Sequence, residues 1–137
     1  MRIRACASSF EISDADVVIG SRYTAGGHTE NPLVLILLSW LVNLSYRLVL
    51  GLPCKDVSNS LRLYDGAVLC PLKLRCESFD IIEEILVKIS RRYPHARIRE
   101  VPITFEKRKK GYSKRNLWLF AASYLWTIVR LFLDHDS

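Results

Sequence analysis

Two long apolar runs place the strongest limit on how this chain can fold. Residues 32–46 carry no charged side chain, and neither do residues 117–129. A helix needs about 20 largely apolar residues to cross a bilayer, and Arg47 and Arg130 interrupt the two runs before that length. The sequence therefore predicts two apolar helices that are buried in a core or lie at a membrane interface, in preference to spanning helices.

The first of these helices is predicted over residues 32–50. Proline suits the first turn of a helix, and the Gly-Leu-Pro sequence at residues 51–53 ends it. Its polar residues recur every fourth position, at Ser39, Asn43 and Arg47. This spacing predicts one polar stripe on an otherwise apolar cylinder, so the stripe should face a polar part of the molecule.

The remaining segments predict an α/β chain. Residues 16–20 form a short apolar run that ends at a glycine, which is typical of a buried strand. Apolar and polar side chains alternate over much of residues 98–105, which predicts a second strand. Ser78 is a suitable N-cap for a helix over residues 79–93, and the last helix is predicted over residues 116–133.

A cationic segment at residues 107–115 stands out within a chain of 137 residues whose net charge is +6. It lies between a predicted strand and a predicted helix start, and Gly111 lets the backbone approach an anion closely. We interpret it as a phosphate-holding loop. A solvated charge run or contact with an anionic membrane surface remains the alternative, because basic runs have several uses.

The cysteine pattern does not indicate a metal site. The chain has four cysteines, none of them in a Cys-x-x-Cys pair or at ligand spacing from a histidine. We expect reduced thiols, with those in the middle of the chain in the core. These are Cys54, Cys70 and Cys76.

Several segments, taken in order, resemble the C-terminal half of family 2 glycosyltransferases. The resemblance is to the polyprenyl-phosphate branch, which includes dolichol-phosphate mannosyltransferases, and it covers residues 16–132. The matching segments are Asp-Val-Val-Ile-Gly-Ser-Arg-Tyr at residues 16–23 with Gly26 and Gly27, Ser39 and Asn43, Asp-Val-Ser-Asn-Ser-Leu-Arg-Leu-Tyr at residues 56–64, Phe79 with Glu84, Glu-Val-Pro-Ile-Thr-Phe at residues 100–105, and residues 108–114.

The resemblance implies the C-terminal portion of a nucleotide-sugar-binding α/β fold of the GT-A type, with interfacial apolar helices. Residues 14–115 would be the acceptor side of a transferase domain, residues 116–137 a C-terminal apolar helix, and residues 1–13 are unassigned. A complete member moves a sugar from a nucleotide donor to a lipid-phosphate or glycan acceptor at the cytoplasmic face of the membrane. A lipid phosphate is already ionised, so catalysis consists of positioning anions and neutralising charge.

The resemblance also implies roles for individual residues. Asp56 and Glu84 would be catalytic, and the acceptor or phosphate would be bound by Arg22, Arg62, Arg108, Ser113 and Lys114. Structural alternatives remain open: Arg22 could brace a turn, Asp56 could pair with Arg62, and Glu84 could be solvated or pair with the cationic segment. Ser39 and Asn43 are expected to pack rather than to bind ligands.

Some features depart from the family pattern. The nucleotide-binding half and its metal-binding Asp-x-Asp are not found, and Asp14-Ala15-Asp16 lies directly against the first strand, so we interpret it as a chance match. No metal ligand is therefore assigned in this chain, although a complete member would use Mg²⁺ or Mn²⁺. Leu35 stands where the branch often has an arginine, which leaves the acceptor open between a lipid phosphate and a glycan.

The missing half has a predicted consequence for the sheet. Residues 17–20 should lie at an open edge, where a partner such as the N-terminal half could pair. Expected partners are also the nucleotide sugar, the acceptor and an anionic membrane surface. Nucleic acid is not expected, because only Tyr112 interleaves with the cationic segment. The alternative function is a non-catalytic peripheral membrane or interaction module.

Overall fold

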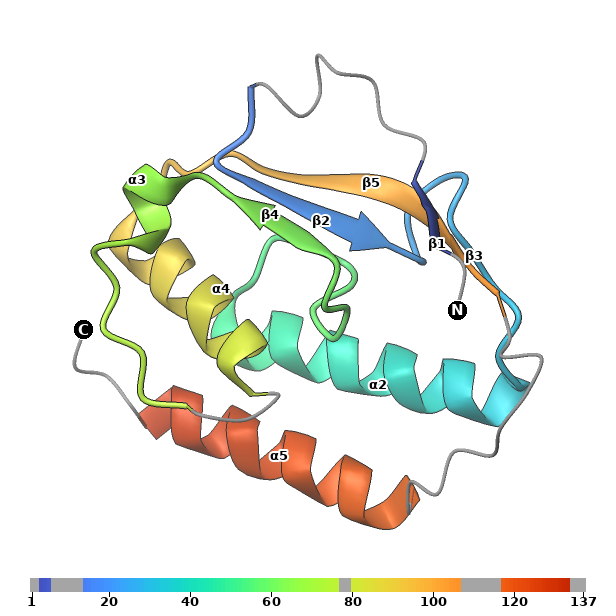
Figure 1. Ribbon diagram of the computed structural model, residues 1–137. Coiled ribbons are helices and arrows are strands. Elements are labelled where there is room, and N and C mark those ends of the chain that lie inside the picture. Colours follow the sequence, from blue (N-terminus) through green and yellow to red (C-terminus); the bar gives the residue numbers. More distant parts are fainter. Residues whose placement is uncertain (1–2, 6–13, 77–79, 107–116, 134–137) are drawn as a thin grey trace.

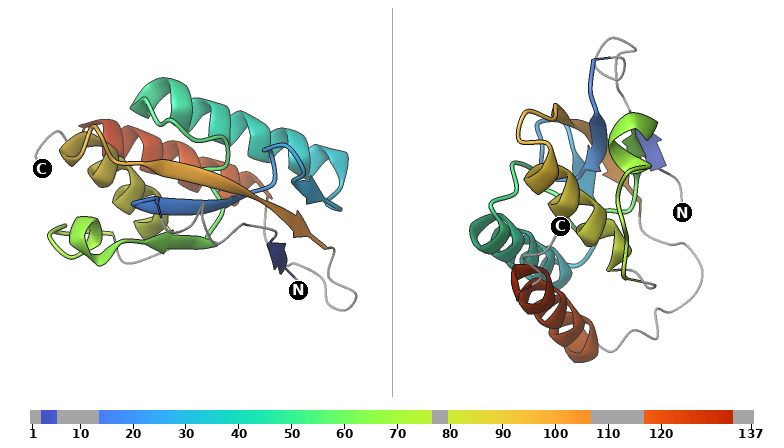
Figure 2. Two further views of the ribbon diagram at one scale, coloured as in Figure 1. Left: turned by 90° about the horizontal axis from the view of Figure 1, so that it is seen from above. Right: turned by 90° about the vertical axis from the view of Figure 1, so that its left-hand side faces the viewer.

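The computed structural model describes residues 3–5, 14–76, 80–106 and 117–133, and it confirms a mixed α/β chain (Figure 1). The strands are β1 (Ile3–Ala5), β2 (Val17–Ser21), β3 (His28–Thr29), β4 (Arg62–Tyr64) and β5 (Ile98–Phe105). The helices are α2 (Leu33–Leu50), α3 (Gly66–Leu69), α4 (Ile81–Arg92) and α5 (Leu117–Leu133). The longer helices α2, α4 and α5 lie on one side of the sheet (Figures 1 and 2).

The sheet follows the order β1-β5-β2-β4, and β3 also pairs with β5. β2 is parallel to β5, with Val17 opposite Ile98, and antiparallel to β4, with Val18 opposite Leu63. The prediction that residues 17–20 lie at an open sheet edge was therefore wrong. β4, at residues 62–64, pairs with β2 on that side.

α2 confirms the predicted apolar helix and both of its limits. Pro32 directly precedes the first helical residue, and Gly51 follows the last with a φ of 66°. This left-handed conformation is common where a helix ends and is costly for residues other than glycine. The predicted polar stripe is buried only in part: Asn43 is buried, whereas Arg47 is exposed.

α4 and α5 complete the helical layer. α4 begins at Ile81, two residues later than predicted, and the proposed cap at Ser78 lies outside the described residues. The Tyr46 and Tyr124 rings join α2 to α5 edge to face, with centroids 6.2 Å apart. The Arg91 Nη2 donates to the Leu131 carbonyl at 2.9 Å and ties α4 to α5.

The core lies between the sheet and these helices. Its buried members come from β2, the three long helices and the segment after α2: Val17, Ile19, Tyr46, Leu52, Cys54, Val57, Leu86, Val87, Ile89, Ile128 and Leu131. Cys54 and Cys76 are buried as predicted, but Cys70 is exposed. The prediction for Cys70 was wrong because it directly follows the short helix α3, which has no buried residues.

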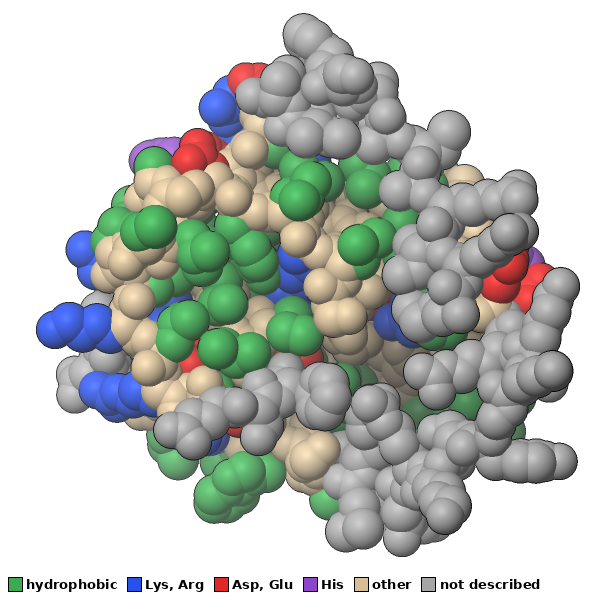
Figure 3. All heavy atoms as spheres, viewed as in Figure 1, with side chains coloured by type: hydrophobic (Ala, Val, Ile, Leu, Met, Phe, Trp, Pro, Cys, Tyr) green, Lys and Arg blue, Asp and Glu red, His purple; other side chains and the backbone are tan. Residues whose placement is uncertain are grey.

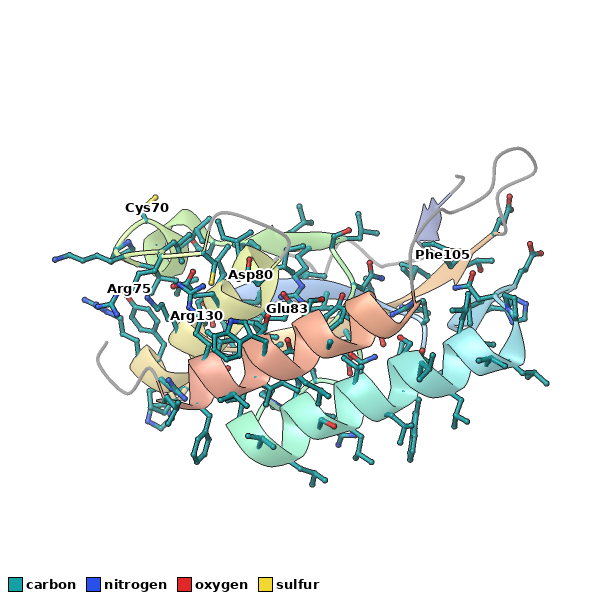
Figure 4. All side chains as sticks on the ribbon, turned by 90° about the horizontal axis from the view of Figure 1, so that it is seen from below. Cys70, Arg75, Asp80, Glu83, Phe105 and Arg130 are labelled. Carbon is teal, nitrogen blue, oxygen red and sulfur yellow. The ribbon has the colours of Figure 1, made fainter. Side chains whose placement is uncertain are left out.

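Large apolar side chains remain exposed on the outer faces of α2 and α5, which lie side by side (Figures 2 and 4). They are Leu33, Val34, Leu37, Trp40, Leu41, Leu48 and Val49 on α2, and Leu125, Trp126, Val129, Phe132 and Leu133 on α5. By length and composition α2 is also able to cross a membrane, a test that core helices of soluble proteins pass as well. We call this surface the apolar helix face.

Candidate functional site

Arg22 lies directly after β2, at the carboxyl end of the parallel pair β2 and β5. Open α/β sheets commonly bind ligands at this end of their parallel strands. The chain then folds back so tightly that a Cβ on Gly27 would lie 2.7 Å from the carbonyl oxygens of Ser21 and Arg22. A glycine is therefore required for the turn that holds Arg22 in place.

Asp56 is the main partner of Arg22. Its Oδ2 accepts from the Arg22 Nε at 2.8 Å and from the Arg22 backbone N–H at 2.9 Å, and its Oδ1 accepts from Nη2 at 2.7 Å. The Asp56 side chain is fully buried. This bidentate pair is the strong form of an arginine–carboxylate interaction, so it fixes the orientation of the guanidinium.

Two serine hydroxyls complete what we call the Arg22 network, which consists of Arg22, Ser39, Asp56 and Ser58. The Arg22 Nη2 lies 3.1 Å from the Ser58 Oγ and 3.3 Å from the Ser39 Oγ. The Asn43 Oδ1 accepts from the Ser58 backbone N–H at 2.9 Å and holds that segment against α2. Ser39 and Asn43 of the polar stripe thus face the network.

The electrostatics of the network keep Arg22 charged. Burial alone would lower the pKa of Arg22, but the hydrogen bonds and negative charge of Asp56 outweigh it, and the pKa is raised. The bonds to described residues use Nε and Nη2. Nη1 is the part of the guanidinium that these bonds leave for an anion, and the side chain is 12% exposed.

Glu100 on β5 positions Asp56 by binding its backbone. Its Oε1 accepts from the backbone N–H groups of Lys55 and Asp56, at 2.8 and 3.0 Å. The sequence motif contained Glu100, but no role was predicted for it. The signal in the sequence was a carboxylate at the third position of a predicted strand. From there, Glu100 reaches the loop that follows α2.

Arg62 has a different environment from Arg22. Its Nε donates to the Asn59 carbonyl at 2.8 Å and its Nη1 to the Ile82 carbonyl at 2.7 Å, and its Nη2 donates to the Val57 carbonyl. Asp56 pairs with Arg22 instead of with Arg62. Arg62 therefore joins the Asp56 segment, β4 and α4 through backbone carbonyls.

Glu84 is buried and organises the segment before α4. Its carboxylate accepts from the backbone N–H groups of Arg75 and Cys76, at 2.9 and 2.8 Å, and pairs with the Lys88 Nζ at 2.9 Å. Burial would raise the pKa of Glu84, but these bonds outweigh it and the pKa is lowered. The alternative of a solvated Glu84 was wrong, because the residue is 1% exposed.

A second buried polar group, the Glu83 cluster, lies between α2, α4 and α5 and consists of Tyr46, Asp80, Glu83 and Arg130 (Figure 4). Among the described residues, no hydrogen-bond partner lies within reach of three buried atoms, the Glu83 Oε2, the Asp80 Oδ1 and the Tyr46 hydroxyl. The Arg130 Nη1 lies 3.6 Å from the Asp80 Oδ2. Burial raises the pKa of Glu83 to about 7, although the charge of Arg62 partly opposes it.

The other predicted residues fall into two groups. Arg108, Ser113 and Lys114 lie outside the described residues. Asp14 pairs with Arg97, and the Asp16 Oδ2 accepts from the Arg97 backbone N–H at 2.6 Å, so both carboxylates join β2 to β5. Within the described part of the chain, no group of three or more metal-ligating side chains gathers.

No protein-family model matches this chain. Among curated proteins, it is 34% identical over 107 residues to an undecaprenyl-phosphate mannosyltransferase from Micrococcus luteus. The match covers 75% of this chain and 43% of that protein, so the chain spans less than half the length of its relative.

Proposed function

We propose that this chain, which is 34% identical to an undecaprenyl-phosphate mannosyltransferase, forms the acceptor side of a family 2 glycosyltransferase of the polyprenyl-phosphate branch. In a complete domain, a sugar moves from a nucleotide donor to a polyprenyl phosphate. The observation that carries the proposal is the Arg22 network, which presents a fixed guanidinium and two hydroxyls beside the carboxyl end of β2.

The network suits an anionic acceptor for a physical reason. A phosphate oxygen takes strong hydrogen bonds from a guanidinium and weaker ones from hydroxyls, and Arg22 with Ser39 and Ser58 supplies both kinds of donor. Asp56 acts by orienting Arg22. Since a polyprenyl phosphate monoester is ionised at neutral pH, the residues need to position it for attack on the sugar and do not need to remove a proton from it.

The other predicted site residues take supporting places in this proposal. Glu84 shapes the segment before α4, and Arg62 holds the chain between Asp56 and β4 in position. Arg108, Ser113 and Lys114 would close on the phosphates from the cationic segment. Together they would neutralise charge as the nucleotide leaves.

Divalent metal chemistry does not fit the described residues. Mg²⁺ binds through carboxylate oxygens and waters, and the closest sequence candidates, Asp14 and Asp16, instead hold Arg97. The metal that a complete enzyme uses would therefore be bound by other residues of that enzyme.

We further propose that the apolar helix face lies on the cytoplasmic side of a membrane. Contiguous exposed apolar surface is unusual on a soluble monomer and marks contact with protein or lipid. A peripheral position would bring the Arg22 network close to the headgroup of a polyprenyl phosphate, while its long apolar tail stays in the bilayer.

The test is binding of the 137-residue chain to neutral vesicles that contain a polyprenyl phosphate, compared with vesicles that contain the corresponding polyprenol. We expect binding that depends on the phosphate and falls at least tenfold in Arg22→Gln and several-fold in Ser39→Ala. Arg92→Gln on α4 makes the same charge change elsewhere and is the matched control. Equal binding to both lipids, or equal losses in Arg22→Gln and Arg92→Gln, would refute the proposal.

A second candidate function is a non-catalytic peripheral membrane module. The apolar helix face favours it, since this surface needs no phosphate ligand. It predicts binding to anionic vesicles without polyprenyl phosphate, with affinity that falls steeply as salt is added. Retention of that binding in Arg22→Gln would favour this function over the first.

A further inference from the structure

Tyr23 follows Arg22 directly in the turn after β2, and the turn holds its backbone in place. The Tyr23 N–H donates to the Ser21 Oγ at 3.3 Å, and Ser21 is fully buried at the end of β2. On the other side of Tyr23, the Thr24 carbonyl accepts from the Gly27 N–H at 2.9 Å and closes the turn. The Tyr23 side chain therefore starts from a fixed place next to the Arg22 network.

The aromatic ring of Tyr23 lies against the Arg22 guanidinium. The Arg22 Cζ is 5.2 Å from the centre of the ring, and a cation is attracted to an aromatic face within about 6 Å. Asp56 holds the same guanidinium through Nε and Nη2. A carboxylate and an aromatic ring thus hold the guanidinium together, and the bonds to described residues leave Nη1 for an anion.

The Tyr23 hydroxyl is buried, and no hydrogen-bond partner for it lies among the described residues. A tyrosine hydroxyl can both donate and accept hydrogen bonds. Leaving such a group buried without a partner costs free energy, so buried tyrosine hydroxyls usually have one. Because the ring that carries this hydroxyl lies against the Arg22 guanidinium, a ligand that Arg22 binds is the natural place to look for the partner.

An anion at the Arg22 Nη1 would supply that partner. A phosphate oxygen accepts strong hydrogen bonds from neutral hydroxyls as well as from guanidinium groups. The Ser39 and Ser58 hydroxyls lie 3.3 and 3.1 Å from the Arg22 Nη2, so one phosphate group could meet donors from several segments at once. Tyr23 would add a donor from the turn after β2.

The surface beside β2 gives each of these donors more weight. Hydrophobic side chains gather on the face of the molecule where β4 and α3 lie, and lysine and arginine side chains are seen mainly along the left-hand margin of this view (Figure 3). β4 pairs with β2, and Arg22 directly follows β2. Among the described residues, a phosphate group at the end of β2 would therefore rely on the Arg22 network and on Tyr23.

We propose that the Tyr23 hydroxyl donates a hydrogen bond to the phosphate group that Arg22 binds, and that the Tyr23 ring holds the guanidinium in position for that group. This inference rests on the proposed function. The sequence motif contained Tyr23, but no role was predicted for it. The phosphoryl oxygens of a polyprenyl phosphate and of a nucleoside diphosphate offer the same chemistry, so the experiment measures both kinds of phosphate.

The experiment uses Tyr23→Phe, which removes the hydroxyl and keeps the ring. Binding of the 137-residue chain to phosphatidylcholine vesicles that contain undecaprenyl phosphate should fall about threefold to tenfold. Tyr23→Leu also removes the ring and should lower binding further. Tyr46→Phe is the matched control, because its hydroxyl is likewise buried without a partner among the described residues but lies in the Glu83 cluster. It should leave binding unchanged. Inorganic pyrophosphate in solution replaces the lipid in the second arm.

Unfolding in urea distinguishes a ligand-binding hydroxyl from a structural one. Without ligand, Tyr23→Phe should leave the urea midpoint unchanged or raise it, because the substitution removes a buried polar group that has no partner. A hydroxyl that is bonded within the protein would give the opposite result. A lower midpoint together with unchanged phosphate binding would therefore overturn the inference.

The binding data separate this inference from the proposed function. A loss in Tyr23→Phe with undecaprenyl phosphate assigns the bond to the acceptor, and a loss with pyrophosphate alone assigns it to the diphosphate of the donor. Equal binding of both phosphates by Tyr23→Phe and the unsubstituted chain, with weaker binding in Arg22→Gln, rejects this inference alone. No phosphate-dependent binding by the unsubstituted chain rejects the proposed function and this inference with it.

Discussion

The Arg22 network and the Glu83 cluster are both largely buried polar groups that include a residue of α2, but they differ in how their charges are satisfied. Asp56 is fully buried and meets three donors of Arg22. Glu83 is 2% exposed, and one of its carboxylate oxygens has no partner in the part of the chain that the structure describes. The difference follows from what surrounds each carboxylate, since Asp56 lies beside Arg22, whereas Glu83 on the first turn of α4 lies near Tyr46 and Asp80.

The comparison teaches that burial alone does not indicate a binding site. A buried charge with partners keeps its charge, whereas a buried carboxyl without partners takes up a proton instead. The pKa of Arg22 is raised, which favours its charged form, and burial raises the pKa of Glu83 to about 7, which favours its neutral form. Only the first arrangement presents a fixed charge to an anion.

The largest expected effect is the loss of stability in Asp56→Ala. Removing one partner of a buried ion pair leaves Arg22 uncompensated, at a cost of about 3–5 kcal/mol. Urea unfolding measures it. The matched control is Asp14→Ala, which breaks a pair that is about half exposed and should cost at most about 1 kcal/mol. Equal losses of unfolding free energy in the two variants would show that the buried pair of Asp56 and Arg22 matters no more for stability than an exposed one.

The next effect is the pH dependence that Glu83 confers. Burial raises its pKa from 4.5 to about 7, so between these values the native state keeps a proton that the unfolded state releases. The stability from this group is present below pH 4.5 and falls as the pH rises to about 7. The loss is on the order of 3 kcal/mol.

Glu83→Gln tests this directly, because glutamine has nearly the same shape and does not titrate. Unfolding curves between pH 4.5 and 8 should show the variant gaining stability over the original protein as the pH rises. Glu106→Gln is a control, since Glu106 is only partly buried at the end of β5. An identical pH profile in Glu83→Gln and the original protein would refute a protonated Glu83.

A smaller effect is expected at Glu100, which connects β5 to the Arg22 network. Glu100→Ala leaves the N–H groups of Lys55 and Asp56 without their acceptor and should cost about 1–3 kcal/mol. Glu100→Gln keeps an acceptor oxygen and should recover most of this loss. Arg99→Ala, at an exposed position of the same strand, is the control. No difference between alanine and glutamine at position 100 would count against the positioning role.

The smallest effect concerns the reactivity of the thiols in the unsubstituted protein. Cys70 is exposed, while burial raises the pKa of the Cys54 thiol to about 12, so iodoacetamide at pH 8 should modify Cys70 first. Peptide mass spectrometry distinguishes the two sites. Asp56→Ala should accelerate modification of Cys54 by loosening the adjacent network. Faster modification of Cys54 than of Cys70 in the original protein would show that the network is open to solvent.

Local patterns in the sequence predicted several elements well. The apolar run after Pro32 and the glycine at position 51 predicted α2 closely, and the alternation over Ile98–Phe105 predicted β5 without error. Both signals are local, since helix limits and strand alternation depend on residues close together in the chain. The motifs that resemble family 2 glycosyltransferases likewise identified the homology.

Other features depended on contacts between distant segments. No local signal showed that residues 62–64 would form β4 beside β2. Nor did one show that Asp56 would form its ion pair with Arg22, which is 34 residues away, instead of with Arg62. Glu83 and Glu84 are neighbours with the same side chain, yet Glu84 meets Lys88 and two backbone N–H groups while Glu83 does not. Their opposite pKa directions come from the surrounding elements.

The sequence by itself determined the resemblance to family 2 glycosyltransferases, the apolar character of α2 and α5, and the residue types available for an anion site. These depend on composition and spacing along the chain. The tertiary structure decided which of those residues meet in the Arg22 network, and that the open edge of the sheet lies at β4 instead of β2. The physical reason is that pairing and burial depend on distances between segments far apart in the chain, which no local pattern encodes.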